Sequence, residues 1–127
     1  MKLLWTILKI LLALFMIYAG VQHFIKPTFY LVFVPDFLPY KVWVVYLSGV
    51  IEIALGILLL IPHYSRMGAT GILWLMILFL PIHVWDVFSY QPAIGSSEAA
   101  MIRLPIQFVF IGLAWGVKKY ATGNSLD

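Results

Sequence analysis

Four long apolar stretches constrain this chain more than any other feature of its sequence. They cover residues 3–22, 42–61, 67–85 and 99–117, and each is close to the roughly 20 residues that an α-helix needs to cross a bilayer. Their apolar residues run on without alternation, so helices are predicted and not the strands of a barrel. We therefore expect an all-α integral membrane protein, a four-transmembrane-helix bundle in one domain over residues 1–127.

The composition argues against a soluble fold. Of the 127 residues, 64% are apolar and 10% are charged, whereas soluble domains average about 45–50% apolar and about 25% charged residues. So short a chain cannot bury that much hydrocarbon inside itself, and the predicted partner is the lipid bilayer. The eight Lys and Arg are scattered, so no nucleic-acid partner is expected. Without cysteine, the chain has no disulfide or thiol chemistry of its own.

Two of the stretches need a further argument before they are read as membrane spans. The second contains Glu52, but its thirteen Leu, Ile and Val contribute roughly −4 to −8 kcal/mol to insertion. A central acidic residue costs about 2.5–3.5 kcal/mol on the same scale, so insertion is still favourable. The first stretch follows Lys2 and is expected to be a retained helix instead of a signal peptide, because its apolar run is long and no A-x-A site follows it.

The basic residues predict the orientation. With both termini in the cytoplasm, the inner side carries more Lys and Arg than the outer side, which is the usual bias of membrane proteins. The inner set is Lys2, Arg66, Lys118 and Lys119, with Lys9 near that side, and the outer set is Lys26, Lys41 and Arg103. The first outer loop, residues 23–40, is apolar and interrupted by three prolines, so we expect it to be partly re-entrant or interfacial.

Six polar side chains lie within or at the ends of the predicted helices, where ionisable groups are costly and need a reason. Because the helices alternate in direction, all six are expected in the outer half of the bundle. They form the candidate polar pocket: His23, Glu52, His83, Asp86, Arg103 and Gln107. Structural alternatives stay open, since Glu52 can fix helix packing, His23 can cap its helix and Arg103 can reach the interface. His83 can likewise serve as a partner of Asp86.

Small residues predict where helices approach each other closely. The predicted packing residues are Gly20, Ser48, Gly49, Gly56, Gly112 and Gly116. The last two form a G-x-x-x-G pair, which serves either packing within the bundle or the seam of a homo-oligomer. No P-loop, G-x-S-x-G, H-E-x-x-H or dinucleotide fingerprint is present, so catalytic residues stay unassigned. The His and acidic residues lack a tight ligand spacing, and no metal site is predicted.

Five segments of the sequence carry a resemblance to a known family. They are residues 19–27 (AGVQHFIKP), 35–39 (PDFLP), 48–56 (SGVIEIALG), 80–83 (LPIH) and 103–107 (RLPIQ). Together they resemble the DoxX-like family of small four-helix bacterial membrane proteins. The resemblance implies a bundle in the bacterial cytoplasmic (inner) membrane and little about activity. Some members are associated with thiosulfate:quinone oxidoreductase, others with oxidative-stress proteins, and animal members with receptor assembly. Many members carry Phe-Pro-Ala-Asn in place of LPIH, so no shared role is implied for the histidine of that segment.

Three functions fit these observations. The first is a quinone-linked redox subunit, in which Glu52 and a histidine exchange protons with the ligand. The second is a non-enzymatic assembly or interaction partner of another membrane or redox protein. The third is the binding or transport of a small solute or lipid in the polar pocket. Whether the chain is an enzyme stays open, and a quinone is the candidate cofactor.

Overall fold

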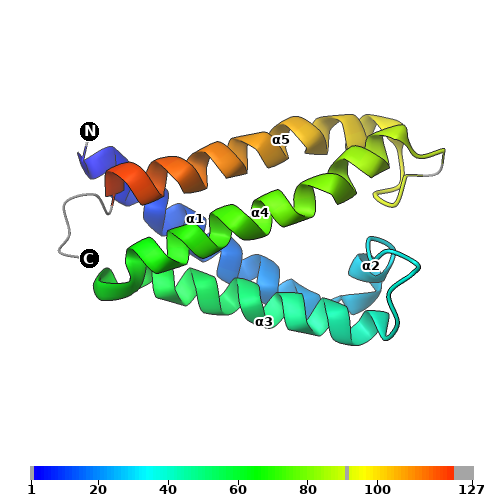
Figure 1. Ribbon diagram of the computed structural model, residues 1–127, viewed down its shortest axis with the longest axis horizontal. Coiled ribbons are helices and arrows are strands. Elements are labelled where there is room, and N and C mark those ends of the chain that lie inside the picture. Colours follow the sequence, from blue (N-terminus) through cyan, green and yellow to red (C-terminus); the bar gives the residue numbers. More distant parts are fainter. Residues whose placement is uncertain (1, 91, 122–127) are drawn as a thin grey trace.

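The computed structural model describes residues 2–90 and 92–121, and most of these residues are helical. In chain order the helices are α1 (Lys2–Ile25), α2 (Pro27–Leu31), α3 (Lys41–Leu60), α4 (Ser65–Phe88) and α5 (Ser97–Gly116) (Figure 1). A 3-10 turn, η1 (Pro62–Tyr64), precedes α4, and a π-helical turn, η2 (Val117–Ala121), follows α5. None of the described residues forms a strand, so the expected all-α class is confirmed.

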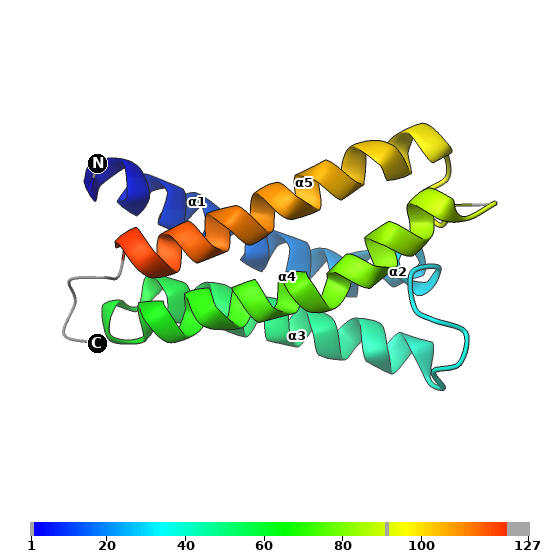
Figure 2. The same cartoon turned by 45° about the horizontal axis from the view of Figure 1, so that its top comes forward.

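The four long helices form two antiparallel pairs. α1 packs along α3, α4 packs along α5, and contacts between α3 and α4 join the pairs (Figures 1 and 2). At one end of the bundle, here called the terminal end, Trp5 of α1 stacks on Tyr120 of η2 with ring centroids 5.1 Å apart. At the opposite end, here called the loop end, lie α2 and the connection between α4 and α5.

Local chemistry explains where the helices begin and end. α1 continues to Ile25 instead of ending at residue 22, and it stops before Pro27 because the residue preceding a proline is driven out of the helical region. Pro27 then begins α2, a short helix that was not predicted inside the apolar loop. At α5, the Ser96 side chain accepts a hydrogen bond from the Ala99 amide at 3.1 Å and caps the helix.

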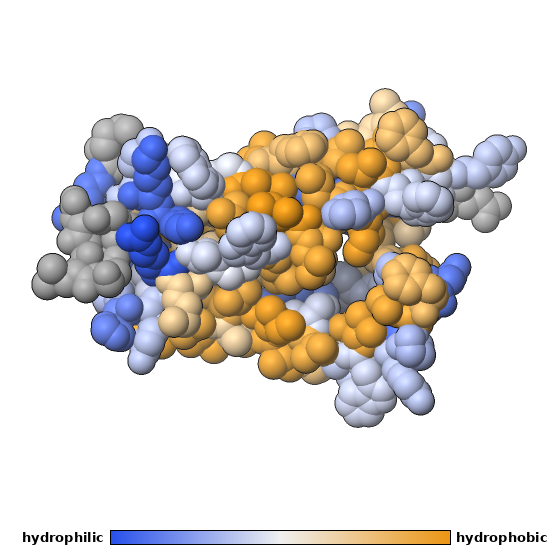
Figure 3. All heavy atoms as spheres, in the orientation of Figure 1, coloured by the Kyte–Doolittle hydropathy of each residue, from blue (hydrophilic) through white to orange (hydrophobic). Residues whose placement is uncertain are grey.

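Most large apolar side chains face outward, and the core between the helices is small. The largest fully buried apolar side chains are Leu12, Met16, Leu59, Ile72 and Val117. On the face that Figure 3 shows, an apolar band crosses the middle of the molecule and more hydrophilic side chains gather at both ends. Among the residues that the structure describes, four helices are long and apolar enough to cross a membrane, and most of the residues in each are not buried within the chain. These features indicate a multi-pass membrane protein.

Glycines allow α1 and α3 to cross closely. A Cβ at Gly20 would lie 2.6 Å from the carbonyl oxygen of Gly49, and a Cβ at Gly56 would lie 2.9 Å from that of Ala13. A larger residue at either position would therefore push the two backbones apart, as expected where small residues let membrane helices approach. This close crossing brings the polar side chains of the two helices into contact.

Candidate functional site

A buried histidine–glutamate pair joins α1 to α3. His23 Nε2 lies 2.9 Å from Glu52 Oε2, and the two side chains are 9% and 6% exposed. The contact is short, yet Oε2 has no hydrogen bond of normal geometry, so the two atoms are close without being aligned as a straight hydrogen bond.

The second ring nitrogen of His23 determines where the pair holds its proton. Nδ1 lies 3.0 Å from the carbonyl oxygen of Val45 and 3.0 Å from Ser48 Oγ. A carbonyl only accepts, so Nδ1 carries a hydrogen and donates it, while the Ser48 hydroxyl donates to the same carbonyl at 3.0 Å. Nε2 then faces the Glu52 carboxyl, and a proton held by the pair has Nε2 and the carboxyl as its two positions.

An aromatic ring from α2 covers this pair. The rings of Tyr30 and His23 are 4.0 Å apart between centroids and are tilted by 33°. Burial raises the pKa of the half-buried Tyr30 phenol above its ordinary value of 10.0, and the charges of Glu52 and Tyr18 raise it further. Tyr30 therefore remains a neutral phenol at physiological pH.

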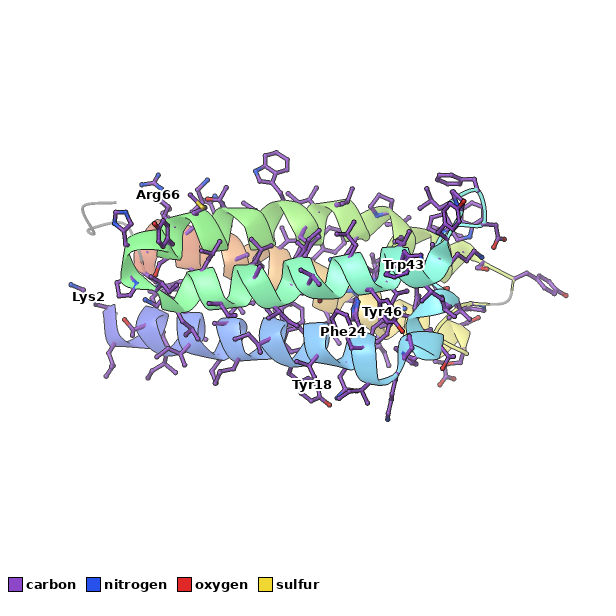
Figure 4. The ribbon with its side chains drawn as sticks, turned by 90° about the horizontal axis from the view of Figure 1, so that it is seen from below. Lys2, Tyr18, Phe24, Trp43, Tyr46 and Arg66 are labelled. Carbon is purple, nitrogen blue, oxygen red and sulfur yellow. The ribbon has the colours of Figure 1, made fainter. Side chains whose placement is uncertain are left out.

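More aromatic side chains lie between α1 and α3 toward the loop end. Phe24 and Tyr46 are stacked with centroids 5.2 Å apart, and Trp43 meets Tyr46 edge-on at 6.0 Å. Figure 4 shows these rings far from Lys2 and Arg66, which lie at the terminal end. These three rings therefore form a contact cluster in the loop-end part of the α1–α3 pair.

A second polar cluster joins α4 to α5. Asp86 Oδ2 lies 3.2 Å from Arg103 Nη1, and the Asp86 side chain is 4% exposed. The same carboxylate accepts hydrogen bonds from the backbone N–H groups of Ala93 and Ile94. The ring of Phe33, which follows α2, lies 4.5 Å from the Arg103 guanidinium. This cluster therefore fixes residues 93–94 between the two helices and connects α5 to the segment after α2.

The remaining two candidate residues have different surroundings. Gln107 is buried, and its Nε2 donates to the backbone carbonyl of Met76 at 2.7 Å. Pro81 lies further along α4 and has no N–H, so the helix lacks one backbone hydrogen bond there. His83 is half-buried, and its Nδ1 is a fully buried atom with no hydrogen-bond partner among the described residues.

The polar contacts of the structure thus divide the candidate residues into separate groups. His23 and Glu52 form one cluster, and Asp86 with Arg103 forms another. Within residues 2–90 and 92–121, no ion pair or hydrogen bond links these two clusters. The reason is the pairing of the helices, because each antiparallel pair satisfies the charges that it carries.

The predicted packing residues also have different roles. Gly20, Gly49 and Gly56 lie at the crossing of α1 and α3, and Gly116 lies against the Trp5 indole. A Cβ at Gly112, in contrast, would meet no atom within 4 Å. Of the two uses left open for the G-x-x-x-G pair, packing within the chain therefore does not apply to Gly112. Ser48 contributes its hydroxyl, which contacts His23 Nδ1 and donates to the Val45 carbonyl.

A surface groove of about 890 Å³ lies at the loop end, between residues 31–43 and residues 92–93. Its polar lining is the ion pair of Asp36 with Lys41, whose charged atoms are 2.6 Å apart. The hydrogen bond and the charge of Lys41 lower the pKa of the exposed Asp36 carboxyl. Neither member of the buried pair lines this groove. The groove is open and the pair is sealed, so we place the candidate site at the pair, where desolvation makes polar chemistry strong.

Tyr30 is a residue of the site that was not predicted from the sequence. The only local signal is Pro27, which favours the first turn of a helix and so gives residues 27–31 a defined direction. The Val45 carbonyl was also missed, because a backbone group leaves no mark in the residue types. Both contacts depend on how α2 and α3 lie against α1.

These observations define the class of protein: a helical bundle of four candidate membrane spans with a buried histidine–glutamate pair. Residues 12–118 match the family described as a domain of unknown function, DUF8561, and the chain belongs to that family. The matched region includes both polar clusters. No curated protein and no solved structure matches the chain.

Proposed function

We propose that this chain is a multi-pass protein of a bacterial inner membrane, related to the DoxX-like family, that binds a quinone-class molecule beside His23 and Glu52. The buried ion pair of these residues carries the proposal. Its Oε2 lies in an apolar interior without an aligned hydrogen bond. Buried polar atoms nearly always have such a partner, so an exception points to a ligand or a chemical role. A buried carboxyl beside an imidazole also fits the polar end of a quinone.

The pair has the chemistry that a proton-coupled ligand requires. Because His23 Nδ1 donates to the Val45 carbonyl, a mobile proton has two positions in the pair, Nε2 and the Glu52 carboxyl 2.9 Å away. The pair can give this proton to an acceptor oxygen, which leaves a carboxylate beside a neutral imidazole, and regain it from water. A quinone would supply such oxygens, and in this proposal its electrons come from a partner redox protein.

The proposed orientation places the terminal end in the cytoplasm and the loop end outside. Lys2 and Arg66 lie at the terminal end (Figure 4), and the positive-inside bias assigns that end to the cytoplasm. The buried pair then lies in the outer half of the bundle. α2 lies at the outer interface, where the exposed side chains of Phe29 and Val32 suit the boundary between acyl chains and headgroups.

Gentle purification tests the proposal, followed by mass spectrometry and ultraviolet spectroscopy of the molecules that remain bound. We expect a quinone with the wild-type chain and its loss from Glu52→Gln, because an amide cannot share the proton. Glu98→Gln is the matched control, since Glu98 is exposed in the first turn of α5. A wild-type sample that carries no quinone and binds none when it is added contradicts the proposal.

A second candidate function is non-enzymatic assembly with another membrane protein or with a second copy of the chain. The observation that favours it is the open face at Gly112, because exposed small residues on membrane helices allow close approach of another helix. Gly112→Leu should then reduce cross-linking to the partner in native membranes without changing the quinone content. Equal cross-linking in the variant and the wild type would weaken this alternative.

A further inference from the structure

The ring face of His23 is the only part of its side chain that the polar contacts leave free. Nδ1 is used by Val45 and Ser48, and Nε2 is used by Glu52. Tyr30 lies over the ring with centroids 4.0 Å apart. Flat rings stack favourably in such offset or tilted arrangements, so this face is an aromatic docking position that the chain itself fills.

The side chain that fills the position resembles the proposed ligand. Tyr30 presents a six-membered ring with one oxygen substituent, and a quinone or quinol presents a six-membered ring with two. Its phenol stays protonated because burial and the charge of Glu52 oppose ionisation. A flat ring with an uncharged oxygen substituent therefore already lies on the imidazole.

The helix that carries Tyr30 is weakly held. α2 has five residues, none of which is buried, and its N-cap residue Lys26 makes no side-chain capping hydrogen bond. Several of its neighbours in the same loop are strongly exposed, such as Phe37 at 83%. Segments with few buried contacts open at low free-energy cost compared with the core. α2 can therefore leave the pair without unfolding the four long helices.

We infer that Tyr30 occupies the ring position of the quinone-class ligand on His23, and that α2 opens to admit that ligand from the loop end. This inference rests on the proposed function, because it names where the ring of the same ligand lies. The ligand ring replaces the Tyr30 ring on the imidazole. Tyr30 thus competes with the ligand and keeps the empty site closed.

The effect of Tyr30 on the apparent dissociation constant of the ligand can be bounded. A stacked aromatic pair is favoured over separated rings by a factor of about 2 to 12. A ligand that binds only the open form has an apparent dissociation constant raised by the inverse of the open fraction. Removing the Tyr30 ring should therefore tighten binding of the ligand by about 2- to 12-fold, instead of weakening it.

Thiol labelling measures, without any ligand, how far the Tyr30 ring shields the His23–Glu52 pair from a reagent in solution. The sequence has no cysteine, so Ser48→Cys places a single thiol beside His23. The probe is 2-sulfonatoethyl methanethiosulfonate, which is charged and does not cross lipid. We expect slow labelling of this variant and labelling about 2- to 12-fold faster when Tyr30→Ala is added. Tyr30→Phe should stay slow because the ring remains, and Phe37→Ala is the control for loss of an exposed ring from the same loop.

Ligand binding is then measured by calorimetry with a short-chain benzoquinone, on the wild type, Tyr30→Ala and Tyr30→Phe. Tighter binding to Tyr30→Ala alone supports the inference. Weaker binding to Tyr30→Ala overturns it, because Tyr30 is then part of the ligand site. Unchanged labelling of the cysteine also overturns it, because the ring is then not the cover.

Failure of the proposed function gives a different pattern. Faster labelling with no quinone binding to any variant overturns the quinone proposal, and with it the ring position, while Tyr30 remains the cover of the pair. Tyr30→Leu is a second variant that keeps apolar bulk but cannot stack, in case Tyr30→Ala does not fold. It should label as fast as Tyr30→Ala and bind the benzoquinone as tightly.

Discussion

The two polar clusters of this bundle lie on neighbouring helix pairs, but their chemistry differs. Between α4 and α5, Asp86 has three donors: the Arg103 guanidinium and two backbone N–H groups. Between α1 and α3, Glu52 meets a single imidazole and its Oε2 has no aligned hydrogen bond. The first cluster is a carboxylate–guanidinium pair whose acid has three hydrogen-bond donors. The second can become neutral by moving one proton.

This difference separates a structural fastening from a candidate functional site. A guanidinium stays charged at any ordinary pH, so Asp86 must remain a carboxylate for the pair to be balanced. Its backbone partners also bind it to the connection between α4 and α5. The His23–Glu52 pair has no such requirement, and it lies under a removable ring. A group that can exchange a proton and be uncovered is suited to a ligand.

The largest expected effect on stability follows from replacing Asp86 by its amide. Asp86→Asn leaves Arg103 without a counter-charge, so it should lower the free energy of unfolding by about 3 kcal/mol. The lower end of the usual range applies because the Arg103 side chain is 25% exposed. Detergent-induced unfolding in mixed micelles, followed by tryptophan fluorescence, measures the change.

Combining the substitution with Arg103→Met serves as the control, since the double variant removes both charges and should recover part of the loss. If Asp86→Asn alone is as stable as the wild type, the Asp86 cluster does not stabilise the fold more than the His23–Glu52 pair does.

Smaller changes in the free energy of unfolding, opposite in sign, are expected from alanine substitutions at Gly49 and Gly112. Gly49→Ala would place a Cβ 2.8 Å from the His23 Cβ and 2.9 Å from the Gly20 carbonyl oxygen. Overpacking of this kind should destabilise the chain by about 1–3 kcal/mol and separate His23 from Glu52. Gly112→Ala fills open space in a helix and should stabilise it by about 0.5–1 kcal/mol. The same unfolding assay measures both variants, and equal losses would show that the α1–α3 crossing is not tight.

The comparison of clusters also shows what the sequence could predict. The lengths and apolar character of the four stretches predict the long helices, because a bilayer sets both quantities. The small residues around Gly20 and Gly49 predict a close helix crossing. The division of the polar residues was not predictable, because it depends on which helices pair. Depth along the helices predicts a common level for Asp86 and Glu52 but not their partners, which are Arg103 for the first and His23 for the second.

Glu52→Gln should have the smallest effect on stability among the buried changes and the largest effect on function. With Nδ1 donating to Val45, a neutral His23 can accept a hydrogen bond at Nε2 from the new amide. The cost should therefore be about 1 kcal/mol, the value of an ordinary hydrogen bond, compared with about 3 kcal/mol for Asp86→Asn. Unfolding measurements and quinone binding on the same sample separate the two effects. A loss as large as that of Asp86→Asn would indicate a permanent ion pair and would remove the distinction between the clusters.

The exposed ion pair of Asp36 with Lys41 is expected to stabilise the fold less than either buried cluster. Lys41 lowers the pKa of Asp36 below its ordinary value of 3.8, so the pair stabilises the fold above that pH. The contribution is lost as the pH falls through the lowered pKa of the folded state. Because the Asp36 side chain is 99% exposed, water screens the pair, and Asp36→Asn should leave the midpoint of thermal unfolding nearly unchanged at pH 7. At pH 3 and below, the small difference between the variant and the wild type should shrink. A large difference at pH 7 would mean that the loop-end segment is held by this exposed pair, and α2 would then not be free to open over His23.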